Sequence, residues 1–220
     1  LSDTTVSANA AAGGAALDSY GSASIERCAF HGNTGGALSV DGGSLVNSTV
    51  SGNDSGFDEI VAVYSAGFLI TNSTIADNTA GKALLAIGAI TLVNASVTGT
   101  SGGPECGILG GSIVSLGHNL DDDGTCAGSG PGDRPFRNPQ LGQLANNGGP
   151  TLTMLPGPAS PLANAGNDPA CPATDQRGVL RNVGPGNACD IGAVEFSVPE
   201  PAAAALGVAA LLSLGMLRRR

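Results

Sequence analysis

The stretch LVNSTVSGN, residues 45–53, recurs in altered form along the first half of the chain. Related stretches begin at Leu1 (LSDTTVSAN), Ile25 (IERCAFHGN), Ile70 (ITNSTIADN) and Leu92 (LVNASVTGT). Each stretch opens on Leu or Ile and has a second apolar residue five positions later. Self-similarity at a period of 20–25 residues is typical of solenoids, in which stacked repeats bury an apolar side that one repeat cannot bury alone.

Each repeat also contains a second short apolar run after a Gly-containing turn, such as GALSV (36–40) or EIVAVYS (59–65). None of these runs keeps helical spacing, so we expect two or three short strands in each coil. The fold class predicted is all-β, a right-handed parallel β-helix over residues 1–112. One interior column should stack at the ordinary strand spacing of about 4.8 Å; its members would be Val6, Phe30, Val50, Ile75 and Val97. Because Leu1 falls inside a repeat, we expect further coils upstream.

A recurrent asparagine follows the second apolar residue in all but the last copy, at Asn9, Asn33, Asn53 and Asn78. Asparagine tolerates a left-handed backbone at a sharp corner, and stacked amides can form a hydrogen-bonded ladder. A position that recurs with the repeat serves the repeat, so we expect a structural ladder rather than ligand contacts. N-x-S/T sequons begin at Asn47, Asn53, Asn72 and Asn94, and the repeat itself explains them.

The chain is acidic, with a formal net charge of −9, and three of its nine basic residues are Arg218, Arg219 and Arg220 at the very end. Such a body repels nucleic acid, so we expect no nucleic-acid partner. The chain has 35 Gly, no Trp and only seven other aromatic residues, two Tyr and five Phe. Small residues suit tightly stacked β-coils.

Beyond the repeats, four phrases stand out: GHNLDDDGTC (117–126), the Pro- and Asn-rich run 141–166, CPATDQRGV (171–179) and ACDIGAVEF (188–196). Together they resemble the choice-of-anchor Q domain, which is found at the end of bacterial surface β-helix proteins. The resemblance covers about residues 113–197. It implies an exported surface protein and no particular reaction. We expect this region to form a last coil and an irregular cap over the open end of the solenoid, where unpaired strand edges would otherwise recruit other chains.

Five cysteines are present. In an oxidising location we expect two disulfides, Cys106–Cys126 and Cys171–Cys189, each closing a loop worth about 3 kcal/mol. Cys28 occupies a repeat position held elsewhere by small residues and should be a buried thiol. The cysteines lack C-x-x-C spacing and the chain has only two histidines, so we expect no zinc site, no other metal and no cofactor.

An enzyme must be weighed, because many parallel β-helices act on polysaccharides. Glycoside hydrolysis needs two facing carboxylates. The acidic residues lie mostly at turns, and no two have the spacing that would stack them on neighbouring coils; they are Asp41, Asp54, Asp58, Glu59, Asp77 and Asp121–Asp123. The scarcity of aromatic residues also argues against a sugar-stacking cleft. We assign no catalytic residue, interpret Asp121–Asp123 as a solvated turn rather than a calcium site, and expect an ion pair between Asp175 and Arg177.

The chain ends in VPEPAAAALGVAALLSLGMLRRR, residues 198–220. The 16 uncharged residues 202–217 would span about 24 Å as a helix, short of a ~30 Å hydrocarbon core. The order of Pro-Glu-Pro, apolar run and arginines resembles the PEP-CTERM sorting signal of Gram-negative bacteria, which an exosortase recognises and cuts. The resemblance implies that Pro199, Glu200 and Pro201 are the recognition motif. Arg218, Arg219 and Arg220 would stop transfer on the cytoplasmic side. The alternative is a plain membrane anchor that is never cut.

These features together predict an exported, non-enzymatic β-helix protein of the bacterial cell surface. Its role would be adhesion or association with an extracellular polysaccharide matrix, with an exosortase-type enzyme as a partner. The unprocessed form would sit in the inner membrane with its body outside. Two alternatives stay open: a polysaccharide lyase or hydrolase whose active coils lie upstream, and a structural spacer.

Overall fold

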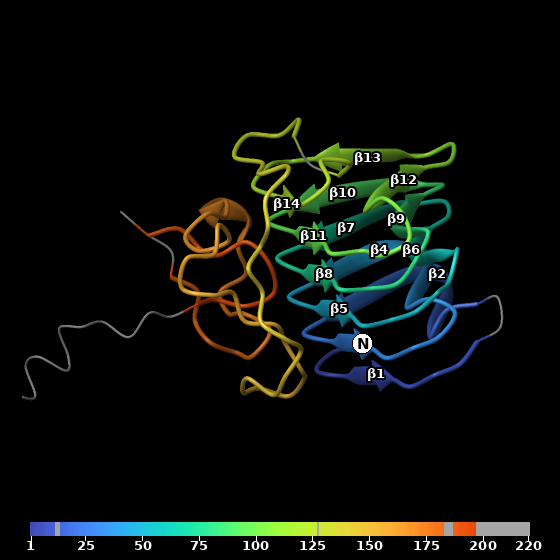
Figure 1. The fold of residues 1–220 in the computed structure, drawn as a ribbon, viewed down its shortest axis with the longest axis horizontal. Coiled ribbons are helices and arrows are strands. Elements are labelled where there is room, and N and C mark those ends of the chain that lie inside the picture. The colour runs from blue at the N-terminus through green and yellow to red at the C-terminus, as the bar shows by residue number, and fades with distance from the viewer. Residues whose placement is uncertain (12–13, 127, 183–186, 197–220) are drawn as a thin grey trace, which may run out of the picture.

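The computed structural model describes residues 1–11, 14–126, 128–182 and 187–196. These residues form a parallel β-solenoid of about five turns, as predicted (Figure 1). The strands are β1 (Thr5–Ser7), β2 (Leu17–Glu26), β3 (Ala29–His31), β4 (Leu38–Val46), β5 (Thr49–Ser51), β6 (Glu59–Val63), β7 (Gly67–Thr71), β8 (Thr74–Ala76), β9 (Lys82–Ala86), β10 (Ala89–Val93), β11 (Ser96–Thr98), β12 (Cys106–Ile108), β13 (Ser112–Ser115) and β14 (Leu120–Asp121). A single 3₁₀ turn, η1 (Asp168–Ala170), is the one helical element of the described chain.

The strands form two sheets. One has the order β1-β3-β5-β8-β11-β14, and the other has the order β12-β9-β6-β4-β7-β10-β13 with β2 paired to β4. All pairs between these strands are parallel. The long strands β2 and β4 each cross two faces of the solenoid, whereas later coils divide the same path into β6 and β7, β9 and β10, or β12 and β13. Each full coil therefore contributes three strand segments to the stack.

The predicted interior column is confirmed. Val6, Phe30, Val50, Ile75 and Val97 are paired one to the next in register. The last four are at most 1% exposed. In the next coil Asp121 pairs with Val97, is fully buried and accepts hydrogen bonds from the backbone N–H groups of Gly124 and Cys126. The expectation of a solvated turn is therefore wrong for Asp121, which ends the apolar stack and holds the turn beyond it, although Asp122 is exposed.

The asparagine ladder forms, but its backbone differs from the expectation. The Oδ1 atom of each of Asn33, Asn53 and Asn78 accepts from the side-chain amide of the preceding asparagine, at 2.8–3.0 Å, and also from its backbone N–H. The left-handed residues are those immediately before the ladder: Ala8, Gly32, Gly52 and Asp77. A second left-handed column runs through the sequon asparagines Asn47, Asn72 and Asn94. All four sequon asparagines are at most 1% exposed, so the folded chain does not present them for glycosylation.

Only a short part of the C-terminal region lies over the open end, where the expected cap would be. There Arg134 and Arg137 donate backbone hydrogen bonds to the carbonyls of Asn119 and Asp121, and Arg134 forms a parallel bridge with Leu120. The orange and red part of the chain instead runs along the side of the solenoid, beside β5, β8 and β11 (Figure 1). The strands on this side are buried on both faces, because outward hydroxyls such as Thr49 and Thr74 bond to the returning chain. We call residues 139–182 and 187–196 the lateral cover.

The structure contains both expected disulfides, Cys106–Cys126 and Cys171–Cys189, and Cys28 is a buried free thiol. The first ties β12 to the turn after β14, and the second lies inside the lateral cover. A small core of Leu120, Leu162, Ala165 and Ile191 joins β14 to the lateral cover. Within the described residues no helix is long and apolar enough to cross a membrane. The expected sorting motif Pro199–Pro201, the apolar helix and Arg218–Arg220 lie outside the described residues.

Candidate ligand-binding groove

An open groove of about 580 Å³ runs along the outer face of β2, β4 and β6, within the range of small-molecule sites. These strands lie on the opposite side of the solenoid from the lateral cover (Figure 1). The walls and floor of the groove are formed by Gly14, Ala15, Asp18, Ser19, Tyr20, Gly35, Leu38, Ser39, Asp41, Asp58, Glu59, Ala62 and Tyr64. The groove therefore spans three successive coils.

Strand register explains how these side chains meet. Val40 and Val63 are paired in register and point into the core, fully buried or nearly so. The next residue along each strand, Asp41 and Tyr64, therefore points outward, since successive side chains alternate between the two faces. Tyr20 follows Ser19, which pairs with Val40, and lies in a β-bulge where Tyr20 and Gly21 together oppose Asp41. Tyr20, Asp41 and Tyr64 thus line the groove from three successive coils.

Both tyrosines of the chain line this groove. Tyr20 is 96% exposed and Tyr64 is 44% exposed. Phe57, beside Asp58, is 98% exposed. The scarcity of aromatic residues argued against a sugar-stacking cleft, but the few that are present are not evenly spread, and three of them lie exposed in or beside this groove. Exposed tyrosines offer an apolar face and a polar tip, which suits a ligand with both kinds of surface.

The groove contains four carboxylates, those of Asp18, Asp41, Asp58 and Glu59, and no basic residue lines it. Within the described residues, none of the four side chains forms a hydrogen bond or an ion pair. The nearest cation in register is Lys82, which pairs with Glu59. The stem of Lys82 lies instead over Gly107 on the far side, where a Cβ would approach its Cδ to 2.2 Å. The four carboxylates are therefore available to a ligand.

The acids come from different strand columns, which is why their spacing gave no signal in the sequence. Asp41, Asp58 and Glu59 were among the acidic candidates considered from the sequence. Asp18 was missed, because the sequence does not show that β2 and the turn before β6 line one groove. Among the described residues no group of three or more His, Cys, Asp or Glu side chains has the arrangement needed to hold a metal ion.

Four of the other acidic candidates, Asp54 and Asp121–Asp123, have structural partners, whereas the side chain of Asp77 has none among the described residues. The side chain of Asp54 accepts the N–H of Gly56, and Asp122 accepts the N–H of Gly99. Glu105, which the sequence did not single out, binds Thr100, the residue at the ladder position of the last copy: its two carboxylate oxygens accept from the N–H and hydroxyl of Thr100. Burial raises the pKa of Glu105 to about 7, and neighbouring Asp122 acts in the same direction.

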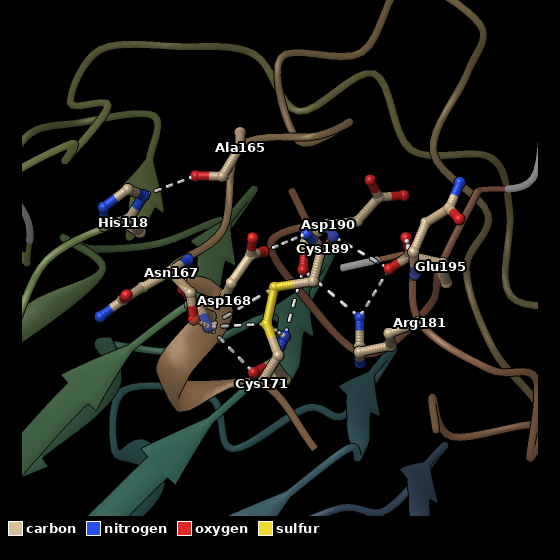
Figure 2. Close-up of a disulfide and its surroundings, with 12 residues drawn as sticks. His118, Ala165, Asn167, Asp168, Cys171, Arg181, Cys189, Asp190 and Glu195 are labelled. Atoms are coloured by element: carbon tan, nitrogen blue, oxygen red, sulfur yellow. Dashed lines mark hydrogen bonds and ion pairs between the residues drawn. A yellow bond between two sulfur atoms is a disulfide. The ribbon is translucent and has the colours of Figure 1, made fainter. Parts of the chain in front are cut away.

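The lateral cover holds a second set of charged side chains, and these form ion pairs or hydrogen bonds with the protein (Figure 2). Arg181, fully buried in its side chain, forms an ion pair with Glu195 at 3.2 Å and donates to the carbonyls of Asp190 and Gly192. Asp175 and Arg177 form the expected ion pair at 2.8 Å. Asp168 accepts the N–H of Cys189 beside the disulfide. This cluster stabilises the packing of the cover.

No family model matches the chain, and no curated protein or solved structure matches it.

Proposed function

We propose that this chain is the exposed part of an exported bacterial surface protein, built as a right-handed β-helix, that holds extracellular polysaccharide along the groove of β2, β4 and β6. The observation that supports this most is the meeting of both tyrosines with carboxylates that have no protein partner among the described residues. Carboxylates accept hydrogen bonds from sugar hydroxyls, and tyrosine rings pack against the apolar faces of sugar rings. The protein acts by binding and not by cleavage.

Export is supported by the two disulfides, which persist in oxidising compartments. The resemblance of residues 113–197 to the choice-of-anchor Q domain and of residues 198–220 to the PEP-CTERM signal agrees with this. In this proposal the tail directs the body to the cell surface, and an exosortase recognises Pro199, Glu200 and Pro201. The arginines at positions 218–220 hold the uncut form in the inner membrane.

Calorimetric titration with soluble neutral, amino and acidic oligosaccharides tests the binding function. Wild type should bind at least one of them, and the Tyr20→Ala/Tyr64→Ala double variant should weaken that binding by about tenfold or more, a loss of ~1.4 kcal/mol. Phe136→Ala is the matched control, because Phe136 is 72% exposed and lies outside the groove. Unchanged affinity in the double variant, or binding of none of the sugars, would overturn the proposal. Release of new reducing ends would make the protein an enzyme.

The sorting proposal has a separate test. Surface-localised protein from the native host should lack the residues that follow the Pro-Glu-Pro motif, as measured by intact mass. Glu200→Ala should cause the uncut form to accumulate in the membrane fraction. Surface material that still ends at Arg220 would contradict exosortase processing and favour the plain anchor.

A further inference from the structure

We infer that the polysaccharide held in the groove is cationic: a polymer of amino sugars in which some amino groups are free and protonated. This inference rests on the proposed binding function and specifies its ligand class. Its basis is the balance of charge, with four carboxylates lining the groove and no basic residue among the lining residues.

The surroundings of the groove strengthen its negative field. Arg27 and Lys82 are the only Lys or Arg residues among the first hundred. Arg27 is occupied by ion pairs with Asp3 and Glu26, and the stem of Lys82 lies over Gly107 on the next coil. A concave surface lined by one sign of charge concentrates ligands of the opposite sign. A polymer of uronic acids would be repelled from the same surface.

The mixture of residue types also fits an ammonium group better than an inorganic cation. Tyr20, Asp41 and Tyr64 line the same groove from three successive coils, so a cation near the Asp41 carboxylate can also approach a tyrosine ring. A ligand ammonium over a tyrosine face gains about 0.5–2 kcal/mol. Hydrogen bonds from ammonium to carboxylate are roughly twice as strong as neutral ones. Sugar hydroxyls and ring faces would occupy the remaining walls, which include Ser19 and Ser39.

The carboxylates themselves favour a ligand rather than a structural role. In the lateral cover the three acids Asp175, Asp190 and Glu195 all accept hydrogen bonds from the protein. In the groove the four acids have no such partners among the described residues. Solvent hydrates these acids in the free protein, and a ligand cation would replace solvent as their partner.

The test compares three soluble probes by calorimetry at low salt: a glucosamine pentamer, its fully N-acetylated form, and an oligogalacturonate of similar length. The glucosamine pentamer should bind about tenfold or more tightly than the acetylated form, and the oligogalacturonate should bind most weakly. The preference should shrink severalfold in 0.5 M NaCl, because salt screens exposed charges. Equal affinity for the two pentamers, or tighter binding of the oligogalacturonate, would overturn the inference.

A charge-neutral groove provides the matched variant: Asp18→Asn, Asp41→Asn, Asp58→Asn and Glu59→Gln combined. It should lose the preference for the glucosamine pentamer and keep any affinity for the acetylated one. If the acetylated pentamer binds wild type as tightly as the glucosamine pentamer, the inference fails and the binding function stands. If no probe or neutral sugar binds, both fail. A preference that survives in the neutral variant would place the cation site outside the groove.

Discussion

The two long sides of the solenoid use acidic residues in opposite ways. On the side of β5, β8 and β11, the lateral cover buries Asp175, Asp190 and Glu195 to 2% exposure or less, and each is held by hydrogen bonds. On the side of β2, β4 and β6, acids of the groove face solvent with no partner among the described residues. On the first side the protein itself satisfies these acidic groups, although Nε of Arg181 is buried without a partner. On the second side solvent satisfies them, so only the groove acids are open to a ligand.

This difference predicts that changes in the lateral cover alter stability and leave sugar binding intact. The largest effect should come from Arg181→Ala. The guanidinium contacts Glu195, the carbonyl of Gly192 and the side chain of Asn47. Its removal leaves a buried carboxylate uncompensated, which costs about 3–5 kcal/mol. Urea unfolding followed by circular dichroism measures the loss.

Two further variants should lose less stability than Arg181→Ala. Arg137 is exposed, and Arg137→Ala should change the free energy of unfolding by less than about 0.5 kcal/mol. Arg181→Lys retains the charge without the planar fork and should fall between the two. If Arg181→Ala is as stable as wild type, the cover does not depend on its buried charges. If Arg181→Ala folds too poorly for a urea titration, a lower free energy of unfolding in Arg181→Lys than in Arg137→Ala still supports the prediction.

A smaller effect is expected in the asparagine ladder. Asn53 is 1% exposed, and its Oδ1 accepts from Asn33 while its amide donates to Asn78 and to the carbonyl of Phe30. Asn53→Ala would leave buried donors unpaired at a cost of about 2–3 kcal/mol. Asn9→Ala, at the exposed end of the ladder, should cost less than about 1 kcal/mol. Equal losses at both positions would show that the ladder is not a continuous unit.

The ladder and the interior column were predictable because a stacked repeat places equivalent residues at equivalent points. The residues of one coil therefore predict the positions of their equivalents in the next coil. This holds up to the coil where Asp121 replaces an apolar residue. The left-handed corner was predicted one position too late. Glycine occupies it at residues 32 and 52, and the asparagines that follow tolerate the same backbone conformation, so the sequence pointed to them instead. Composition alone could not show this detail.

The lateral cover and the groove were not predictable in the same way. The cover is held by contacts between distant, non-repeating residues, such as the side chain of Gln176 with Thr49 and the carbonyl of Cys28. Such pairs leave no period in the sequence. The groove gathers residues from separate columns and turns, so its acids and tyrosines appear scattered along the chain. Outward hydroxyls at Thr49 and Thr74 were the one available sign that this side would be covered.

The pH dependence of stability should report on the end of the ladder. Burial raises the pKa of Glu105 from 4.5 to about 7 and that of Asp190 from 3.8 to about 6. Between these values the folded chain holds protons that the unfolded chain has lost, so the free energy of unfolding should fall as pH rises from about 4.5 to 7. Glu105→Gln should flatten this slope, as measured by urea midpoints at pH 5 and 7.5. A slope of the opposite sign would contradict the buried, protonated Glu105.

The smallest stability effect, and the one that most sharpens the contrast between the two sides, is expected in the groove. Neutralising its four acids removes repulsion between exposed like charges and should raise the free energy of unfolding by about 0.5–1 kcal/mol. Addition of 0.5 M NaCl should close most of the difference between this variant and wild type, because exposed charges are screened. A gain in stability paired with a loss of cationic-sugar binding is the pattern of residues kept for function at the expense of the fold. A loss of stability would mean that these carboxylates have structural partners after all, and the two sides of the solenoid would then differ in exposure alone.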